Sequence, residues 1–410
     1  MILLHAAPIR WGSIGGLHVS IPALVAAQNH LPGVRAALAV TVAQRQQPPQ
    51  LGFPVFDGKI RVDRGGRLSL PAPFDRPDLV VFHSTYIPAQ AALARRLHRN
   101  GIPYIICPRG GMTRYAQSFR RWKKRLGNLL FFDRMVARSQ AVHCLTDGEA
   151  GATVGWNRPV FVVGNGIELP AESALAAPGY NAGLRLVFIG RLHVQYKGLD
   201  MLLEACGWLR AELIDAGASV QLYGPDDHGS ATLLRRQIAG LGLRDVVTLA
   251  GPVTGGEKAA ILQQADVFLH PSRSEGHPMS VLEALAHGLP CLLTPATNMA
   301  EEVAAAGAGW RVEASVDAVA DGIRQVLSTD RSVLQQAGRN ARRLAAANYG
   351  WDTIAAGSVR HYRQWTDRDT SGPMQVLGRH LTGEETPPGR TSQPFPIVRE
   401  HAAQVEVQRT

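Results

Sequence analysis

The sequence predicts an α/β protein made of two doubly wound, Rossmann-like domains that face each other across a cleft. The chain has 410 residues, which exceeds the size at which a single hydrophobic core stops growing, so two domains are expected. Short apolar runs alternate with helical patterns in both halves, and buried strands that alternate with helices are typical of a mostly parallel sheet. Such sheets bind ligands beyond the carboxyl ends of their strands, which places the expected site in the cleft.

The apolar runs define the predicted strands. The first half contains MILLHAA, RAALAVTVA, DLVVFHS, PYIICP, AVHCLT and VFVVGNG, and the second contains LRLVFIG, ASVQLYG, VVTLAG, DVFLHPS and PCLLT. Residues 168–183 separate the two series, so we expect one domain over residues 1–170 and another over 184–348. A last amphipathic helix is predicted over 351–366, packing back on the N-terminal domain. Residues 367–410 have no sustained period and are predicted to be disordered.

Composition narrows the class of protein. The hydrophobic fraction of 45% and the charged fraction of 19% are those of a soluble globular protein. No apolar run approaches the roughly 20 residues of a membrane-spanning helix, and the N-terminus lacks a basic leader, so we expect a cytoplasmic protein. The cysteines are scattered and predict buried free thiols. The formal net charge of +10 attracts anions, whether nucleic acid, lipid head groups or phosphorylated substrates.

Two glutamates follow the strand DVFLHPS in the stretch SEGHPMSVLEALAHGLP. Pro278 suits the first turn of a helix that runs to about His287, and the free amides of its N-terminus form an anion site suited to phosphate. Phosphate would repel an acid, so Glu275 is predicted to accept hydrogen bonds from neutral hydroxyls, as on a sugar, and Glu283 from a ribose. Spacing alone leaves open that both are ordinary solvated acids.

Two cations follow the strand LVFIG in the stretch RLVFIGRLHVQYKGLDMLLEA. Arg191 ends the strand and Lys197 precedes the next helix, so both stand at the carboxyl edge of the sheet. A bidentate arginine and a lysine point charge match a diphosphate and can neutralise a departing nucleotide without a metal. In isolation, the spacing leaves open that both are solvated loop cations.

Together these motifs carry a family resemblance. GRLHVQYKGLD, followed later by PSRSEGHPMSVLEALAHGLPCLLT, resembles the retaining glycosyltransferases of family 4, which have the GT-B fold. The N-terminal half adds the glycine loop SIGGLHVSIPALV, the strand end DLVVFHSTY and the junction VVGNGIEL. Each motif is weak alone, and their order along nearly the whole predicted ordered chain is specific.

The resemblance implies a reaction and a site. The reaction is retaining, metal-independent transfer of a hexose from a UDP or GDP sugar, without a cofactor, through an oxocarbenium-like transition state. The N-terminal domain is implied to take the acceptor and the C-terminal domain the donor. Glu275 then contacts the hydroxyls of the donor sugar, Glu283 the ribose, and Arg191 and Lys197 the diphosphate. The implied donor site comprises Gly15, Gly16, Gly190, Arg191, Lys197, Glu275, Gly276, Met279, Ser280 and Glu283.

The segment from Tyr104 to Ala150 resembles a subgroup that acts in bacterial surface-polysaccharide pathways. This resemblance implies an acceptor such as a lipid-linked oligosaccharide or another glycan, in exopolysaccharide or lipopolysaccharide assembly; a small molecule or a glycolipid is the alternative. Many family members carry a histidine where this chain has Arg109, so a histidine role is not carried over. Arg109 is expected either to bind acceptor phosphate or leaving-group charge, or to be a plain loop arginine.

Two further features belong to the predicted acceptor side. His83 ends the strand DLVVFHS and is predicted to act as an acceptor-side hydrogen-bonding group and a catalytic candidate, with a structural histidine as the alternative. A basic run between 120 and 125 interleaves with Trp122 and several leucines at helical spacing. Such a helix lies on an anionic membrane, here at the inner face of the plasma membrane, or packs its stripe on the sheet. In both cases Lys123 and Lys124 face a polyprenyl-diphosphate acceptor.

Other function classes fit less well. A metal-dependent transferase needs an Asp-x-Asp after a buried strand, and the one such pair, Asp367 with Asp369, falls in the predicted tail. The sequence has no strand-linked GxGxxG and no GxxxxGK, which argues against a dehydrogenase and an NTPase. A nucleic-acid-binding protein would show salt-dependent binding that survives loss of the predicted site, and we expect no such partner. A degenerate, inactive family member is at odds with the intact motifs.

Overall fold

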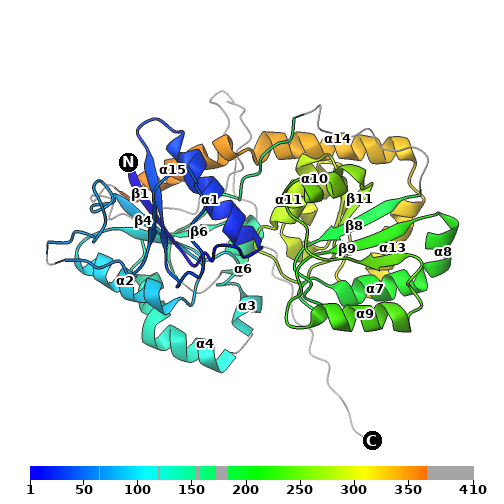
Figure 1. Cartoon of the computed structure of the whole chain (residues 1–410), viewed down its shortest axis with the longest axis horizontal. Coiled ribbons are helices and arrows are strands. Elements are labelled where there is room, and N and C mark those ends of the chain that lie inside the picture. Colours follow the sequence, from blue (N-terminus) through cyan, green and yellow to red (C-terminus); the bar gives the residue numbers. More distant parts are fainter. Residues whose placement is uncertain (64, 119–120, 154–156, 172–182, 367–410) are drawn as a thin grey trace, which may run out of the picture. The chain divides into compact units, whose positions relative to one another are not determined.

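The computed structural model describes residues 1–63, 65–118, 121–153, 157–171 and 183–366. These residues form two parallel sheets, each with helices on both faces (Figure 1). The predicted disordered tail and most of the predicted boundary segment lie outside the described residues. The predicted α/β class is confirmed.

The N-terminal sheet has its seven strands in the order β3-β2-β1-β4-β5-β6-β7, all parallel. The strands are β1 (Ile2–Ala7), β2 (Arg35–Val40), β3 (Val55–Asp57), β4 (Leu79–His83), β5 (Tyr104–Cys107), β6 (Val142–Cys144) and β7 (Val160–Val162). The helices of this half are α1 (Gly16–Asn29), α2 (Pro88–Arg99), α3 (Arg114–Ser118), α4 (Arg121–Gly127), the π-helical turn η1 (Asn128–Phe132), α5 (Asp133–Ala137) and α6 (Asp147–Ala152).

The central strand β1 shows why these runs read as continuously apolar. Successive side chains of a strand point to opposite faces of the sheet. Leu3 therefore packs in the core beneath α1, whereas Leu4 packs in the core beneath α2 and α5. Because helices cover both faces, both sets of side chains are buried and the usual alternation with polar residues is absent.

The C-terminal sheet has six parallel strands in the order β10-β9-β8-β11-β12-β13. They are β8 (Arg185–Ile189), β9 (Ser219–Tyr223), β10 (Val247–Leu249), β11 (Val267–His270), β12 (Cys291–Leu293) and β13 (Gly309–Arg311). One face is covered by α7 (Leu199–Trp208), α8 (Arg210–Asp215), α9 (Ser230–Gly240) and α13 (Val316–Leu327). The other is covered by α10 (Gly255–Gln264), α11 (Met279–Ala286), α12 (Ala300–Ala305) and α14 (Arg331–Asn348), and a 3₁₀ turn, η3 (Pro295–Thr297), precedes α12.

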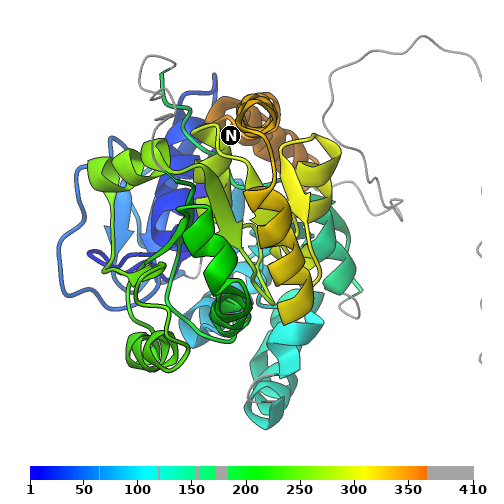
Figure 2. The ribbon, with the colours of Figure 1, turned by 90° about the vertical axis from the view of Figure 1, so that its right-hand side faces the viewer.

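The last helix, α15 (Trp351–Arg363), returns to the N-terminal sheet. Its Ile354, Val359 and Tyr362 are buried in the core that α1 also covers, and Figures 1 and 2 show the orange α15 beside the blue α1. A side-chain hydrogen bond joins the two helices, because Nε2 of Gln28 donates to Oγ of Ser358 at 2.8 Å. Residues from the two ends of the described chain therefore share one core.

The four cysteines are buried free thiols, as the sequence predicts. Burial raises the pKa of Cys107 and Cys206 to about 12, and it raises the pKa of Cys144 and Cys291 as well. They are therefore unreactive core residues. Among the described residues, no helix is long and apolar enough to cross a membrane.

Candidate active site

Glu275 lies in the loop after β11 with 12% of its side chain exposed. Its Oε1 accepts hydrogen bonds from the ammonium of Lys197 and from the hydroxyl of Ser272 at 2.8 Å, and lies 3.0 Å from Nε2 of His270. Its Oε2 has no hydrogen-bond partner among the described residues. Burial alone would raise the pKa of Glu275, but the charge of Lys197 and the hydrogen bond from His270 hold it well below its usual range. Glu275 is thus a fixed carboxylate with one oxygen available to a ligand.

Lys197 belongs to the loop between β8 and α7, and a glycine brings that loop against the end of β11. Gly198 has a φ of 64°, and a Cβ there would stand 2.0 Å from the carbonyl oxygen of Pro271, so only glycine fits. Arg273 fastens the loop after β11 to the first turn of α7 by donating to the two carboxylate oxygens of Asp200 at 2.6 and 2.9 Å. The backbone therefore holds the ammonium of Lys197 within reach of the carboxylate of Glu275.

The N-terminus of α11 opens beside this pair. Pro278 is the N-cap and provides no side-chain cap, so the amides of Met279 and Ser280 are among those that a helix leaves without intrahelical acceptors. A Cβ on Gly16 would lie 3.1 Å from Cγ of Met279. The loop of Gly15 and Gly16 therefore approaches the start of α11 closely, which brings the two glycines next to the predicted phosphate site.

The remaining predicted donor residues take different positions. Glu283 lies on α11 and forms an ion pair with Lys258 of α10, and both side chains are largely buried. Arg191 follows Gly190 at the end of β8 and is 63% exposed, with Nη1 3.6 Å from Oδ2 of Asp227. Arg191 is thus the freer of the two predicted diphosphate cations.

The loop after β5 reaches the Glu275 loop by backbone contact. A Cβ on Gly276 would lie 3.4 Å from the backbone nitrogen of Gly110. Glu149, which is fully buried, fixes this loop by accepting from the amides of Gly110 and of Leu145, the latter at 2.7 Å. Burial raises the pKa of Glu149, although both hydrogen bonds act in the opposite direction.

Asn165 and His277 join the junction loop after β7 to the loop before α11. The amide of Asn165 donates to Nδ1 of His277 at 2.9 Å, and its Nδ2 donates to the carbonyl of His277 at 3.0 Å. A Cβ on Gly164 would lie 2.7 Å from Cε1 of the same ring. Burial lowers the pKa of His277 to about 3, so the ring is a neutral acceptor.

Arg109 is the cation nearest these backbone contacts. It has a φ of 51°, in the left-handed region. Its Nη1 donates to Ser20 at 3.0 Å and to Oδ1 of Asn165 at 3.1 Å, and its Nε donates to Nδ1 of His83 at 3.3 Å. All of these partners are neutral, and none of the ion pairs among the described residues includes Arg109. In the described part of the chain, the guanidinium therefore has no direct ion-pair partner beside the Glu275 loop, although it acts electrostatically on the buried Glu149.

His83 has the environment of a structural histidine, which is the alternative to the predicted acceptor-side role. It is completely buried, and its other nitrogen, Nε2, lies 2.8 Å from Nδ1 of His5. Burial lowers the pKa of His83 well below its usual range, and the charge of Arg109 adds to the effect. With both nitrogens engaged, His83 presents no free polar atom to an acceptor in this arrangement and supports Arg109 instead.

The basic helix α4 and the turn η1 that follows it keep most of their large apolar side chains in solvent. Trp122 is 68% exposed and Leu129 is 70% exposed, and neither packs on the sheet as one sequence alternative would have it. Lys123 lies over the ring of Trp122 at 5.2 Å, and Lys124 lies over the ring of Tyr86 at the same distance. The exposed set, which we call the apolar edge, comprises Trp122, Leu126, Leu129, Leu130 and Phe131.

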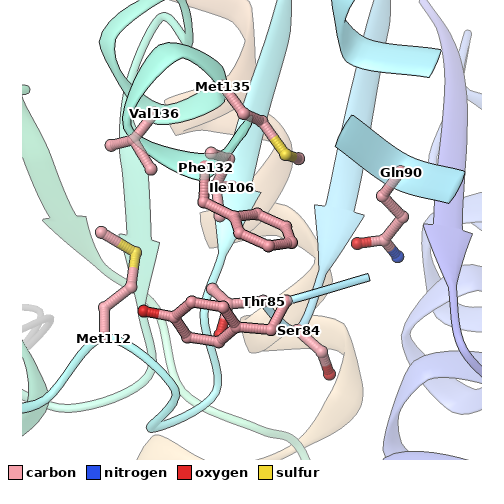
Figure 3. Close-up of a pocket in the computed structure, with 9 residues that line it drawn as sticks. Ser84, Thr85, Gln90, Ile106, Met112, Phe132, Met135 and Val136 are labelled. Carbon is pink, nitrogen blue, oxygen red and sulfur yellow. The ribbon is translucent and has the colours of Figure 1, made fainter. Parts of the chain in front are cut away.

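A small cavity lies between the end of β4 and the segment formed by η1 and α5 (Figure 3). Ser84, Thr85 and Met112 line one side, and Phe132 is among the apolar residues opposite them. The amide of Gln90 stands at its edge, and Figure 3 shows the oxygen toward the cavity. That oxygen, Oε1, is buried without a partner among the described residues. The cavity thus contains one free hydrogen-bond acceptor.

Sequence reasoning missed the residues that hold the predicted ones in place. Some of them left a local signal: His5, His270 and Ser272 are polar residues inside or directly after buried apolar runs, and buried polar groups need partners. Lys258 left none, since it is an ordinary cation of a helix distant from Glu283 in the sequence. In the part of the chain that the structure describes, no group of His, Cys, Asp and Glu could hold a metal ion.

Two family models match the chain. Residues 15–166 match the glycosyl transferase 4-like domain, and residues 183–329 match the glycosyl transferases group 1 domain. The two matches together take in most of the chain and every strand of the two sheets except β1.

Curated proteins and solved structures give the same result. The chain is 28% identical over 249 residues to the putative colanic acid biosynthesis glycosyltransferase WcaL of Salmonella typhimurium, which covers 58% of this chain and 56% of that protein. It is 29% identical over 287 residues to the GDP-mannose:cellobiosyl-diphosphopolyprenol alpha-mannosyltransferase of Xanthomonas campestris, covering 66% and 70%. Several matched relatives are covered over only about half of their length.

Among solved structures, HepE of Anabaena in complex with UDP and glucose has a TM-score of 0.67 to this chain at 17% identity, covering 89% of this chain and 100% of HepE. At this identity the likeness concerns the fold alone. The two facing parallel-sheet domains are those of the GT-B fold, as predicted.

Proposed function

Because the chain belongs to the GT-B glycosyltransferases, with a 4-like N-terminal domain and a group 1 C-terminal domain, we propose that it is a retaining, metal-independent hexosyltransferase. It takes its sugar from a UDP or GDP donor and passes it to a lipid-linked oligosaccharide in the assembly of a bacterial surface polysaccharide. The observation that carries this proposal is the buried pair of Lys197 and Glu275, placed at the uncapped N-terminus of α11 with one carboxylate oxygen free.

The geometry gives each donor group a separate partner. Free amides at a helix N-terminus favour a phosphate, and Met279 and Ser280 supply them. Lys197 gives one of its donors to Glu275 and retains the others for phosphate oxygens. The free Oε2 of Glu275 is suited to a sugar hydroxyl, since a deprotonated carboxylate only accepts. The leaving diphosphate is then neutralised by Lys197 and by Arg191, so that no metal is required.

The acceptor follows from the N-terminal side. Arg109 stands at the Glu275 loop with only neutral hydrogen-bond partners, and an arginine fork binds phosphate oxygens well. Lys123 and Lys124 add cations on α4. The Xanthomonas relative is named for an acceptor with a diphosphopolyprenol, and an acceptor of that class would bring both a diphosphate and a lipid to this side.

The experiment on the complete reaction uses the full chain with a panel of UDP and GDP hexoses and a polyprenyl-diphosphate-linked oligosaccharide. We expect mass spectrometry to show addition of one hexose from one of these donors. Proton NMR of the product is expected to show the anomeric configuration of the donor, and EDTA should leave the rate unchanged. An inverted anomer would contradict retention, loss of the rate in EDTA would contradict metal independence, and no consumption of any donor would contradict the activity.

The apolar edge supports a position at a membrane surface. Its large side chains are exposed beside the cations Arg121, Lys123, Lys124 and Arg125 on and around α4, and Figure 2 shows this cyan segment at the lower border of the ribbon. Apolar side chains flanked by cations bind anionic bilayers through burial in the interface and through attraction to head groups. The protein is thus proposed to bind peripherally to the inner face of the plasma membrane, where a polyprenyl-linked acceptor is found.

Replacing Trp122, Leu129 and Phe131 together by serine is expected to weaken binding to phosphatidylglycerol-containing vesicles at least ~10-fold, because burial of each large apolar side chain contributes ~1.5–3 kcal/mol. Sedimentation with vesicles measures this. The matched control is Trp208→Ser, which removes a 60% exposed tryptophan from α7 of the other sheet and should leave sedimentation unchanged. Equal binding by the triple variant and the unaltered chain would contradict the membrane proposal.

A further inference from the structure

A chain of buried polar groups runs from Arg109 through the N-terminal core to α15. Nδ1 of His83 accepts from Arg109 at 3.3 Å, and the two histidine rings meet through a nitrogen pair 2.8 Å apart. Beyond them, a second nitrogen of His5 lies 2.7 Å from Oε1 of Gln28, whose amide donates to the next hydroxyl at 2.8 Å. The members, in order, are Arg109, His83, His5, Gln28 and Ser358.

The two ends of this chain fix the direction of every hydrogen bond in it. An arginine can only donate, so His83 must offer a lone pair at Nδ1. At the other end, the hydroxyl of Ser358 donates its single proton to the carbonyl of Ala355 at 2.8 Å, and it must therefore accept from the amide of Gln28. The carbonyl oxygen of that same amide is then turned toward His5 and has to accept.

The histidines between these ends have one compatible state. Nε2 of His5 carries a proton for Gln28, so its Nδ1 is a lone pair in the neutral ring. Nε2 of His83 must donate to that lone pair, which leaves Nδ1 of His83 free to accept from Arg109. Each group thus donates to the next from the guanidinium to the backbone carbonyl, and a proton added to either ring would set one donor against another.

We propose that His83, His5, Gln28 and Ser358 are positioning residues that hold the Arg109 guanidinium at the reaction site. This proposal rests on the proposed function, which places the donor diphosphate and the acceptor phosphate near the Glu275 loop. This hydrogen-bond chain explains why Arg109 keeps a backbone φ in the left-handed region and has only neutral hydrogen-bond partners. Backbone strain of this kind persists where the surroundings over-determine it, and here the aligned chain and the loop contacts do so.

Few other titratable groups face the two rings. Arg109 and His143 of β6 act electrostatically on both of them, and the ring of Tyr362 on α15 lies 6.4 Å from that of His5. His143 is engaged elsewhere, with Nε2 2.8 Å from the carbonyl of Val163. Among the described residues no carboxylate bonds to either ring, and burial outweighs the hydrogen bond to Gln28, which raises the pKa of His5.

The protonation states of His83 and His5 can be measured without catalytic turnover. In the full chain labelled with ¹⁵N-histidine, both His83 and His5 are expected to show the neutral tautomer protonated at Nε2 near pH 7. The Nε–H of Arg109 should exchange slowly with solvent, and the replacement His83→Phe should make that exchange fast. Protonation of His83 at Nδ1, or an imidazolium near neutral pH, would overturn the directional chain whatever reaction the protein catalyses.

The positioning role is tested by two replacements of His83 that differ in what they retain. His83→Asn keeps an acceptor where Nδ1 stood but loses ring volume, whereas His83→Phe keeps the ring and loses the acceptor. We expect His83→Phe to lower kcat roughly 10- to 100-fold with little change in KM, since one hydrogen bond to a charged group is lost. His83→Asn should restore most of that loss. If phenylalanine serves as well as asparagine or better, the residue only packs the core and the proposal fails.

A double-mutant cycle connects the effect to Arg109. In the background of Arg109→Ala, the replacement His83→Phe is expected to have no further effect on kcat beyond ~2-fold, because its only route to the reaction has been removed. Equal losses in both backgrounds would overturn the proposal. Full activity of Arg109→Ala would overturn it as well, together with the acceptor role of Arg109, while leaving the proposed sugar transfer intact. The proposed transfer itself fails if Glu275→Gln transfers sugar normally.

Discussion

Replacing Lys197 by methionine is expected to abolish sugar transfer and to destabilise the fold. Methionine retains the length of the side chain but removes the charge that neutralises both Glu275 and the leaving diphosphate. The loss of transition-state charge stabilisation is expected to lower kcat at least ~100-fold. Since the Lys197 and Glu275 side chains are only 14% and 12% exposed, the remaining carboxylate is left buried without a counter-ion, at a cost of about 3–5 kcal/mol.

Glu275→Gln separates these two effects. The amide fits the same space but no longer presents two accepting oxygens, so transfer should again fall at least ~100-fold. The double variant Lys197→Met and Glu275→Gln carries no unpaired charge, and its unfolding free energy is expected to recover while its activity does not. Sugar-transfer assays of the three variants measure the effect on activity, and chemical denaturation measures the effect on the free energy of unfolding.

A surface ion pair of the same sheet serves as the control. Arg311 pairs with Glu301, whose side chain is 73% exposed, and exposed pairs contribute little. Arg311→Met should leave both transfer and the unfolding midpoint nearly unchanged. Near-normal transfer by Lys197→Met or by Glu275→Gln would remove the mechanism proposed here.

The fold was predictable from sequence to the extent that its strands are buried on both faces. Runs such as MILLHAA and DVFLHPS became β1 and β11, because helices on each side bury both faces of the sheet and favour apolar residues along most of each strand. β3 (Val55–Asp57) and β13 (Gly309–Arg311) were not predicted. Both are three-residue strands at the edge of a sheet, where one neighbour is missing and no continuous apolar run is needed.

The residues of the site were predictable only where they belong to a recognisable sequence motif. Glu275 and Lys197 stood out because each follows a buried strand at the edge where parallel strands bind ligands. Their direct contact is tertiary, and it depends on the close approach at Gly198 that local pattern does not report. His83 shows the opposite limit. Its position at a strand end resembled that of a reactive group, and only the structure reveals that His5 and Arg109 occupy both of its nitrogens.

Acidification from pH 7.5 to pH 4.5 is expected to lower the free energy of unfolding by several kcal/mol. Burial lowers the pKa of His5 to about 4 and that of His143 and His277 to about 3. An unfolded chain binds a proton at each of these histidines below about pH 6.5, whereas the folded chain does not. The unfolded state then holds more protons, so stability rises with pH.

The lowered pKa values of these histidines set the sign of the stability change and its pH window. The contribution of each histidine is complete above about pH 6.5 and is lost as the pH falls toward the folded value, by ~2–3 kcal/mol for each at pH 4.5. Glu275 acts in the same direction at lower pH, because its folded pKa lies below the unfolded one. Its contribution is present above about pH 4.5 and is lost below that value.

Chemical denaturation at a series of pH values measures how steeply the free energy of unfolding changes with pH. One variant isolates the contribution of a single histidine proton to this slope. His277→Asn removes a buried imidazole that accepts from Asn165 and should reduce the slope between pH 6.5 and 4.5 by about one proton, or ~1.4 kcal/mol per pH unit. His228→Gln is the control for the loss of a histidine outside the core, since the side chain of His228 is 93% exposed. Constant stability between pH 7 and pH 5 would show that the buried histidines bind protons in the folded state, and the hydrogen-bond chain behind Arg109 would then lack the neutral rings on which its direction depends.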